Sequence, residues 1–162
     1  MIEIEPALKT LTENEVEFII VGGVAITAHG SAYLTQDLDF CYSRARKNLK
    51  AIVSALSPYN PKPRGFPPNL PYFFDETTLQ NGTNFTFRTD LGDIDLLGEV
   101  AGVGGYDAVN QESEIKSLLG FEVKVLTVEG LIKAKRAAGR TKDLLVLPEL
   151  EALREAASSE ED

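Results

Sequence analysis

The order of apolar and polar residues predicts a mixed series of short strands and amphipathic helices. Strands are expected where β-prone apolar residues run together or alternate with polar residues; these segments are residues 18–21, 36–41, 84–89, 94–97, 115–119 and 121–126. Helices are expected where apolar residues share one helical face or where capping residues frame a helix-compatible segment; these segments are residues 5–13, 24–29, 44–56 and 127–138, with further helix in 141–157. This order favours an α+β (α/β-like) domain with a small mixed sheet backed by helices.

Proline and glycine mark the segments that interrupt this pattern. Residues 57–71 contain six prolines, so we expect an irregular loop that is too proline-rich for a helix or a central strand. Residues 99–106 are rich in glycine, but no strand-to-helix switch surrounds them, so a flexible connection is favoured over a phosphate-binding loop. Pro148 is expected in the first turn of a last helix.

Length and composition indicate one compact domain, with 162 residues, 43% of them hydrophobic and 25% charged. We expect a core over residues 1–126, C-terminal helices over 127–157 packed on it in the same domain, and a disordered acidic tail over 158–162. The chain shows no N-terminal signal pattern and no apolar run close to a membrane span, so a cytoplasmic protein with no membrane association is expected. The lone Cys41 cannot form an internal disulfide and is expected in the core.

The charge balance limits the partners. A formal net charge of −9 argues against broad, non-specific nucleic-acid binding that depends on phosphate neutralisation. It leaves room for a local basic patch, because basic residues cluster in 44–50 and again in 133–142. Such clusters are more often solvated helix faces than binding sites.

The candidate chemistry lies where the first two expected strands meet. Asp37 and Asp39 alternate with apolar residues, so both carboxylates point to the same face of a strand. Carboxylate oxygens suit a divalent cation, and Mg²⁺ is commonly shared between one or two carboxylates and substrate phosphates. The Gly22-Gly23 pair, followed by a short helix, offers backbone amides to phosphate oxygens. The arrangement therefore suits phosphoryl or nucleotidyl transfer.

An Asp-x-Asp strand alone is a weak signal, since two exposed acidic residues at this spacing are more often structural. The signal is stronger here because three separate features agree: the glycine pair, the two aspartates, and Asp95 on a later strand. His29, at a helix end, is expected to be a satisfied structural histidine rather than a catalytic one. Thr35 either orients the Asp37 carboxylate or simply favours the strand.

These residues resemble the nucleotidyltransferase superfamily related to DNA polymerase β. The resemblance consists of Gly22-Gly23, thirteen intervening residues, the Asp37-Leu38-Asp39 strand, and Asp95 within Ile-Asp-Leu. The small bacterial nucleotidyltransferases of the AbiEii-like and minimal-nucleotidyltransferase toxin groups are more similar still, because they share a GG–A–HG–T–D–D run. The segment LTVEGLIKAKRAAGRTKDLLVL at 126–147 also resembles the C-terminal helices of that group, so the resemblance covers most of the chain.

The resemblance implies a nucleotidyltransferase fold and a set of roles. Asp37 and Asp39 would bind Mg²⁺, while Asp95 would complete the metal site and assist deprotonation of an acceptor hydroxyl. Gly22 and Gly23 would approach the phosphates of a nucleoside triphosphate. The implied reaction transfers a nucleoside monophosphate to a tRNA end, a protein or a small molecule. Membership of the toxin group would add a cognate antitoxin as a partner.

Lys135 is the candidate that helical spacing adds. It lies seven residues after Val128, near the middle of an apolar stripe that Leu131 and Ile132 share. A lysine in that phase needs an anionic partner, either substrate phosphates or the acidic cluster, unless its chain extends past the stripe to water. Arg140, Lys142 and Asp143 form either a structural ion-pair network or an extension of the same site.

Tyr33 is the one departure from the family pattern, because members with this motif run usually carry arginine there. The sequence is therefore compatible with two functions: an active Mg²⁺-dependent nucleotidyltransferase and a catalytically inactive nucleotidyltransferase-like binding module. The intact Asp37, Asp39 and Asp95 favour the first.

Overall fold

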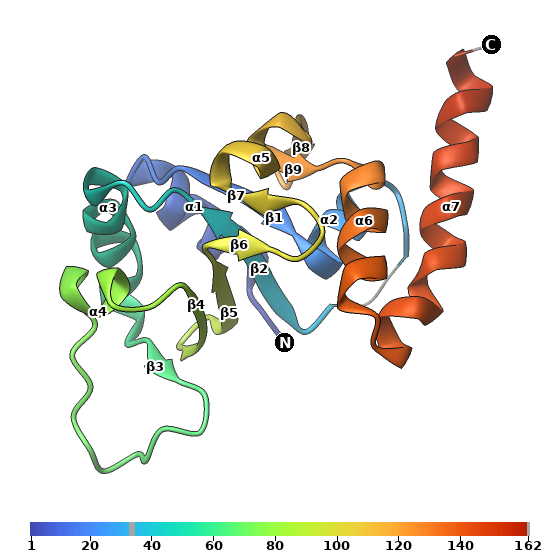
Figure 1. Ribbon diagram of the computed structural model, residues 1–162. Helices are drawn as coiled ribbons and strands as arrows, with labels where there is room; N and C mark the ends of the chain where they lie inside the picture. The colour runs from blue at the N-terminus through green and yellow to red at the C-terminus, as the bar shows by residue number, and fades with distance from the viewer. Residues whose placement is uncertain (33–34, 162) are drawn as a thin grey trace.

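The protein is built on a seven-stranded mixed sheet with helices around it (Figure 1). The computed structural model describes residues 1–32 and 35–161. The strands of the sheet follow the order β3-β4-β5-β2-β1-β9-β8. Their bounds are β1 Phe18–Val21, β2 Asp37–Tyr42, β3 Lys62–Pro63, β4 Asn84–Thr89, β5 Gly92–Leu97, β8 Ser113–Leu118 and β9 Phe121–Leu126; a separate pair is β6 Glu99–Val100 with β7 Gly104–Gly105.

The helices fill the connections between these strands. They are α1 Ile4–Glu13, α2 Gly22–Ala28, α3 Arg46–Leu56, α4 Glu76–Gln80, α5 Tyr106–Gln111, α6 Val128–Ala138 and α7 Thr141–Glu161, with a 3-10 turn at Ser57–Tyr59. The α+β class is thus confirmed, and the strands expected in 18–21, 36–41, 84–89, 94–97, 115–119 and 121–126 are confirmed to within two residues at each end. No described helix combines the length and the apolar content that a bilayer crossing requires.

The centre of the sheet is the most deeply buried part of the core. All four residues of β1 are buried, because β1 lies between an antiparallel neighbour, β2, and a parallel one, β9. Strand β2 alternates, with Leu38 and Phe40 fully buried on one face. Helices α1 and α3 add Leu8 and Ile52 to the same core. One face of β2 is thereby held against the core and its aspartates are turned to the other.

The register places one row of residues across the sheet. Val21 of β1 pairs with Asp39 of β2, and Asp39 pairs with Asp95 of the parallel strand β5. Asp95 in turn pairs with Thr86 of β4, whose carbonyl accepts a hydrogen bond from the Arg64 backbone N–H at 3.0 Å. Directly paired residues share a face, so this row aligns the aspartates with an arginine from the edge of the sheet.

Several local predictions are wrong, each for a physical reason. Helix α7 is continuous with Pro148 inside it, rather than beginning at that proline. The carbonyl four residues earlier belongs to Leu144, which is 48% exposed, so solvent can take the hydrogen bond that proline cannot donate. Helix α7 runs through Glu161, and the disordered tail expected over 158–162 stays a prediction.

The glycine-rich segment 99–106 is an ordered hairpin, β6–β7, and not a flexible connection. Gly102 has φ +80°, and a side chain there would collide with the Lys133 carbonyl and with Ala137 of α6. The glycines therefore allow a tight turn to lie directly on α6. Helices α4 and α5 were not predicted, because each spans only five or six residues, too few for a periodic pattern.

Candidate active site

The three predicted carboxylates meet at one place on the sheet. Asp37 and Asp39 share a face of β2, and the parallel register brings Asp95 of β5 beside Asp39. One carboxylate oxygen from each residue lies within 4.8 Å of the other two, and all three residues are partly buried. This spacing is that of ligands around one divalent cation or a closely spaced pair. Each aspartate comes from a strand of the core, so its position is fixed by the sheet.

Burial and mutual repulsion disturb the titration of this cluster. Burial raises the pKa of Asp39 to about 7, the neighbouring carboxylates of Asp95 and Asp37 add to the rise, and the Lys135 ammonium opposes it. Burial also raises the pKa of Asp95, against the opposing charge of Arg64. Three carboxylates this close cannot all ionise cheaply without a cation.

The residues present fit a divalent metal ion. The Oδ1 atom of Asp39 is buried and has no hydrogen-bond partner within the part of the chain that the structure describes. A buried oxygen without a partner is costly, and coordination to a hard cation is one way to satisfy it. The donor set consists entirely of carboxylate oxygens, the chemistry that Mg²⁺ and Mn²⁺ prefer.

The glycine pair lies directly beside the carboxylates. Gly22 begins α2 with φ +71°, and a side chain at this position would collide with the Asp39 carboxylate. Only glycine satisfies both the backbone angle and the close approach. Helix α2 starts without a side-chain cap on its first amides, and Gly23 is the next residue in that turn. The pair therefore leaves backbone N–H groups available close to Asp39.

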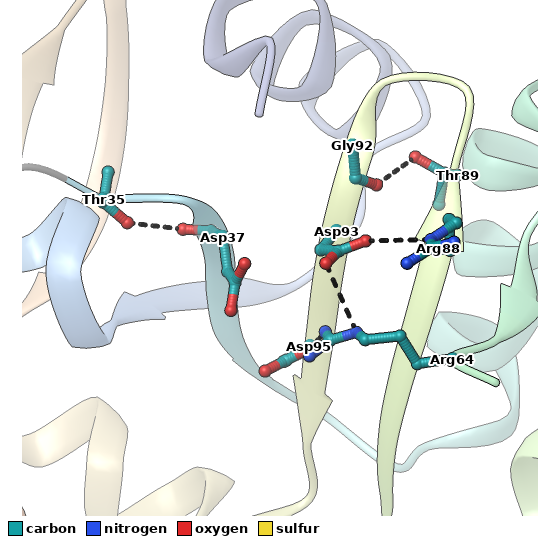
Figure 2. Close-up of polar contacts among 8 residues, drawn as sticks. All are labelled: Thr35, Asp37, Arg64, Arg88, Thr89, Gly92, Asp93 and Asp95. Atoms are coloured by element: carbon teal, nitrogen blue, oxygen red, sulfur yellow. Dashed lines mark hydrogen bonds and ion pairs between the residues drawn. The ribbon is translucent and has the colours of Figure 1, made fainter. Parts of the chain in front are cut away.

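Arg64 is the residue near the cluster that sequence reasoning missed. Its guanidinium forms an ion pair with Asp95 through Nη2, and its Nε lies 3.5 Å from Asp93 Oδ2. Arg88 approaches the other oxygen of Asp93, with 3.8 Å between Nε and Oδ1. Figure 2 shows Arg64 reaching across the sheet face to Asp93 and Asp95, with Arg88 beside them. The proline-rich segment that was expected to be irregular thus supplies an edge strand and a cation for the site.

A second charged cluster lies on the helical side. Asp143 is only 1% exposed; Arg140 donates to it from Nε at 2.6 Å, and Lys135 from Nζ at 3.3 Å. Burial works to raise the pKa of Asp143, but hydrogen bonds from Arg140 and Lys135 outweigh it, so that pKa is lowered. The ion-pair network considered for Arg140 and Asp143 is therefore present, and it includes Lys135.

One cavity connects the two clusters. Its volume is about 250 Å³, and it is lined by Gly22, Asp39, Lys135, Arg140 and Asp143 together with apolar residues of β1, β9 and α6. Lys135 is 20% exposed, so it faces this cavity rather than open solvent. Within the described chain the anionic partner of Lys135 is Asp143, rather than the acidic cluster that the sequence suggested, while Asp39 shares the cavity with it.

The remaining candidates have structural partners. The His29 ring is 5% exposed, and its Nε2 lies 2.8 Å from the Leu126 carbonyl, a contact typical of a satisfied structural histidine. The Thr35 hydroxyl donates to the Asp37 backbone carbonyl at 2.8 Å, so it anchors the strand and not the carboxylate (Figure 2). Cys41 is buried and free, as expected. Tyr33 lies outside the described residues.

Comparison with known structures defines the fold. No protein-family model and no curated protein matches the sequence. Solved structures do match over nearly the whole chain, three among them. The first is the provisionally assigned nucleotidyltransferase TM1012 from Thermotoga maritima, with a TM-score of 0.54, 13% identity, and coverage of 98% of this chain and 96% of that one. The chain has the nucleotidyltransferase fold.

The other two structures are of ANT(2″)-Ia. Its crystal structure in complex with adenylyl-2″-tobramycin matches with a TM-score of 0.56 and 16% identity, over 98% of this chain and 97% of that one. The solution structure of the same antibiotic-resistance factor matches with a TM-score of 0.53 and 18% identity, over 97% and 90%. These TM-scores, over nearly the whole of each chain, show a shared fold, in which this chain places its own cluster of three aspartates.

Proposed function

We propose that this protein is a Mg²⁺-dependent nucleotidyltransferase, which transfers a nucleoside monophosphate from a nucleoside triphosphate to a hydroxyl group and releases pyrophosphate. The observation that carries the proposal is the convergence of Asp37, Asp39 and Asp95 within 4.8 Å beside the Gly22 bend, in a chain with the nucleotidyltransferase fold. ANT(2″)-Ia has been solved with an adenylylated product, which supports nucleotidyl transfer as the reaction class.

The aspartates have distinct roles in this proposal. Asp37 and Asp39 hold the metal ion, whose positive charge, when bound, stabilises the charge that develops on the transferred phosphoryl group. Asp95 lies at the side of the cluster away from Gly22 and accepts the proton of the attacking hydroxyl.

The nucleotide lies on the Gly22 side in the proposal. The uncapped amides of α2 donate to phosphate oxygens of the triphosphate. Lys135 and Arg140 face the same cavity and add positive charge, although both contact Asp143 in this structure. Apolar residues of that cavity, among them Leu131, can hold an uncharged part of the nucleotide and exclude water.

Transfer from triphosphates labelled at the α-phosphate tests the proposal. The wild-type chain, supplied with Mg²⁺ and each of the four nucleotides, is assayed for pyrophosphate release and for label on RNA, protein and small-molecule acceptors. We expect Asp95→Asn to reduce transfer about a hundredfold or more, because a catalytic base contributes on that order. Asp90→Asn is the matched control, since Asp90 is exposed and its side chain accepts one recorded hydrogen bond in the described structure, from Asn60 Nδ2 at 2.7 Å.

Binding separates the two functions that the sequence left open. Calorimetry with Mg²⁺ and a non-hydrolysable triphosphate should show binding that Asp39→Asn weakens. If the nucleotide binds and no acceptor is labelled, the inactive binding module is the correct function. If neither nucleotide nor Mg²⁺ binds, the proposal fails altogether.

A further inference from the structure

Three basic side chains form a strip on the sheet face next to the carboxylates. Lys62 of β3 pairs with Arg88 of β4, and directly paired residues share a face. Arg64 follows two positions after Lys62, and its contact with Asp95 shows that it lies on the same face. We call Lys62, Arg64 and Arg88 the basic strip.

The basic strip is open to solvent and keeps an excess of positive charge. Arg88 is 73% exposed and Arg64 is 30% exposed, and Lys62 is partly exposed. Apart from the cluster residue Asp95, the acidic partner of the two arginines within the described chain is Asp93, and no ion pair recorded there involves Lys62. Two carboxylates, Asp93 and Asp95, thus face three cations, on a chain whose overall charge is −9.

Neighbouring residues keep this part of the sheet accessible. The outward side chain of Thr86 on β4, which pairs with Asp95, is exposed, so no helix within the described structure covers this face beside Asp95. The segment between β3 and α4 leads away from the sheet and projects from the body of the molecule (Figure 1). A ligand that reaches Asp95 from this side therefore passes over the basic strip.

The geometry of the transfer indicates which reactant enters from the side of the basic strip. In an in-line displacement the attacking and leaving oxygens lie on opposite sides of the phosphorus. The paired residues that cross the sheet run from Val21, next to Gly22, through Asp39 to Asp95. They continue to Thr86, whose carbonyl accepts from the Arg64 N–H. If the pyrophosphate leaves on the Gly22 side, as the proposed function requires, then the attacking hydroxyl must enter from the side of the basic strip.

We propose that the basic strip binds a phosphate group of the acceptor, so that the acceptor is a phosphate-bearing hydroxyl compound. This inference rests on the proposed function and specifies its substrate class. Guanidinium groups bind phosphate through paired N–H donors, and Lys62 adds a further charge. Asp93 holds the two guanidinium heads close to the cluster.

With this acceptor, the transfer forms one bond to phosphorus and breaks one. The hydroxyl oxygen forms a new bond to the α-phosphorus of the triphosphate as its proton passes to Asp95. The bond between the α-phosphorus and the bridging oxygen breaks, and pyrophosphate leaves with the electron pair. The phosphate held on the basic strip does not react, and it positions the hydroxyl.

Phosphate-bearing hydroxyls come from two sources, and direct binding distinguishes them. The probes are a short labelled single-stranded RNA with a free 3′ hydroxyl, measured by fluorescence anisotropy, and ribose 5-phosphate, measured by calorimetry. We expect at least one probe to bind wild-type protein. The double variant Lys62→Gln/Arg88→Gln should bind that probe about tenfold more weakly, and for RNA the slope of log affinity against log salt should decrease by about 1.

Matched controls report whether the effect belongs to the basic strip. Arg46 is 75% exposed and pairs with Glu76 at 2.7 Å, so Arg46→Gln removes an equally exposed guanidinium from a remote helix. Lys116 on β8 is 37% exposed, and Lys116→Gln removes an ammonium from the opposite edge of the sheet. Both variants should bind the probes like wild type. The inference is overturned if neither probe binds, or if the double variant and the controls lose affinity equally.

Transfer kinetics separate this inference from the function on which it rests. With the probe that binds, the double variant should raise KM for the acceptor much more than it lowers kcat. Transfer to tobramycin that is insensitive to the double variant would overturn the inference while leaving a nucleotidyltransferase. Strip-dependent binding without transfer to any acceptor would support the phosphate site and overturn the proposed reaction.

Discussion

Two aspartates on opposite sides of one cavity illustrate how differently this protein treats a buried carboxylate. Asp143 is 1% exposed, and Arg140 and Lys135 donate hydrogen bonds to both of its oxygens. Asp39 faces two further carboxylates, and its Oδ1 has no hydrogen-bond partner in the described chain. The pKa of Asp143 is lowered by its partners despite its burial, whereas burial and repulsion raise that of Asp39 to about 7.

The difference distinguishes a satisfied structural carboxylate from the candidate metal site. A carboxylate with two cationic donors is already satisfied, so Asp143 serves to fix α7 against the end of α6. A carboxylate among like charges destabilises the metal-free fold, and such an arrangement gains stability only when a cation binds. The acidic cluster is therefore the part of the molecule whose stability should depend on a ligand. Four predictions test this contrast.

The largest effect is expected from Asp39→Asn. Removing a metal ligand should reduce nucleotidyl transfer about a thousandfold, equivalent to about 4 kcal/mol of transition-state stabilisation. The metal-free variant should be at least as stable as wild type at pH 8, because the neutral amide removes repulsion from Asp37 and Asp95. Thermal unfolding with and without Mg²⁺ measures this, and Mg²⁺ should raise the Tm of wild type only. A variant that loses activity and also unfolds early would show that Asp39 is structural.

The next largest effect is expected from Asp143→Asn, on stability. The substitution leaves Lys135 and Arg140 without their carboxylate partner. Breaking a fully buried pair costs about 3–5 kcal/mol, but Arg140 is 62% exposed and can be hydrated, so we expect about 2–3 kcal/mol in urea unfolding.

Glu151→Gln is the control for that variant, since it breaks an ion pair with Arg136 whose side chains are 57% and 41% exposed. Its cost should stay below about 0.5 kcal/mol. Equal costs for the two variants would show that Asp143 is no more structural than a surface carboxylate.

The sequence was sufficient to predict the acidic half of the site. Period-two alternation placed Asp37 and Asp39 on one face of a strand, and a second short strand carried Asp95. Both signals are local, and the core side of each strand is marked by buried residues such as Leu38 and Ile94. The cap at Thr127 is local too, since its hydroxyl accepts from the Gly130 N–H at 3.1 Å.

Arg64 could not be predicted in the same way, because its position depends on a partner far along the chain. Strand β3 is only two residues long, contains a proline, and exists through its pairing with β4. Proline is compatible with that edge position, but no local pattern reveals the pairing. The start of helix α7 was predicted wrongly for the converse reason. Pro148 resembles a helix start in the local sequence, while the contacts with α6 keep the helix continuous.

A smaller effect is expected from Arg64→Gln, which tests whether the arginine partly stands in for a metal. Losing the ion pair with Asp95 should lower the stability of the metal-free protein by about 1–2 kcal/mol. The same change should tighten Mn²⁺ binding about two- to fivefold, because a competing positive charge is removed from Asp95. Mn²⁺ titration followed by electron paramagnetic resonance measures the affinity.

Arg88→Gln is the control, because Arg88 lies 3.8 Å from Asp93 and makes no recorded contact with the three clustered carboxylates. It should change Mn²⁺ affinity less than Arg64→Gln. Weaker Mn²⁺ binding in Arg64→Gln would instead show that the arginine holds Asp95 in the geometry that the metal requires.

The smallest effect is the pH dependence of stability, which should have opposite causes at the two aspartates. The folded chain holds the Asp39 proton more tightly than the unfolded chain, whose value is near 3.8. Protonation therefore stabilises the fold below pH 7, and this contribution is lost as the pH rises through about 7. Asp143, with its lowered pKa, stays ionised above pH 5 and adds no pH dependence to the stability there.

Metal-free wild type should lose about 1 kcal/mol of stability, or roughly 3 °C in Tm, between pH 5 and pH 8. The loss is limited because solvent reaches the partly exposed cluster. Asp39→Asn should flatten this decline, and saturating Mg²⁺ should stabilise wild type more at pH 8 than at pH 5. Parallel curves for wild type and Asp39→Asn would mean that Asp39 is as well satisfied as Asp143.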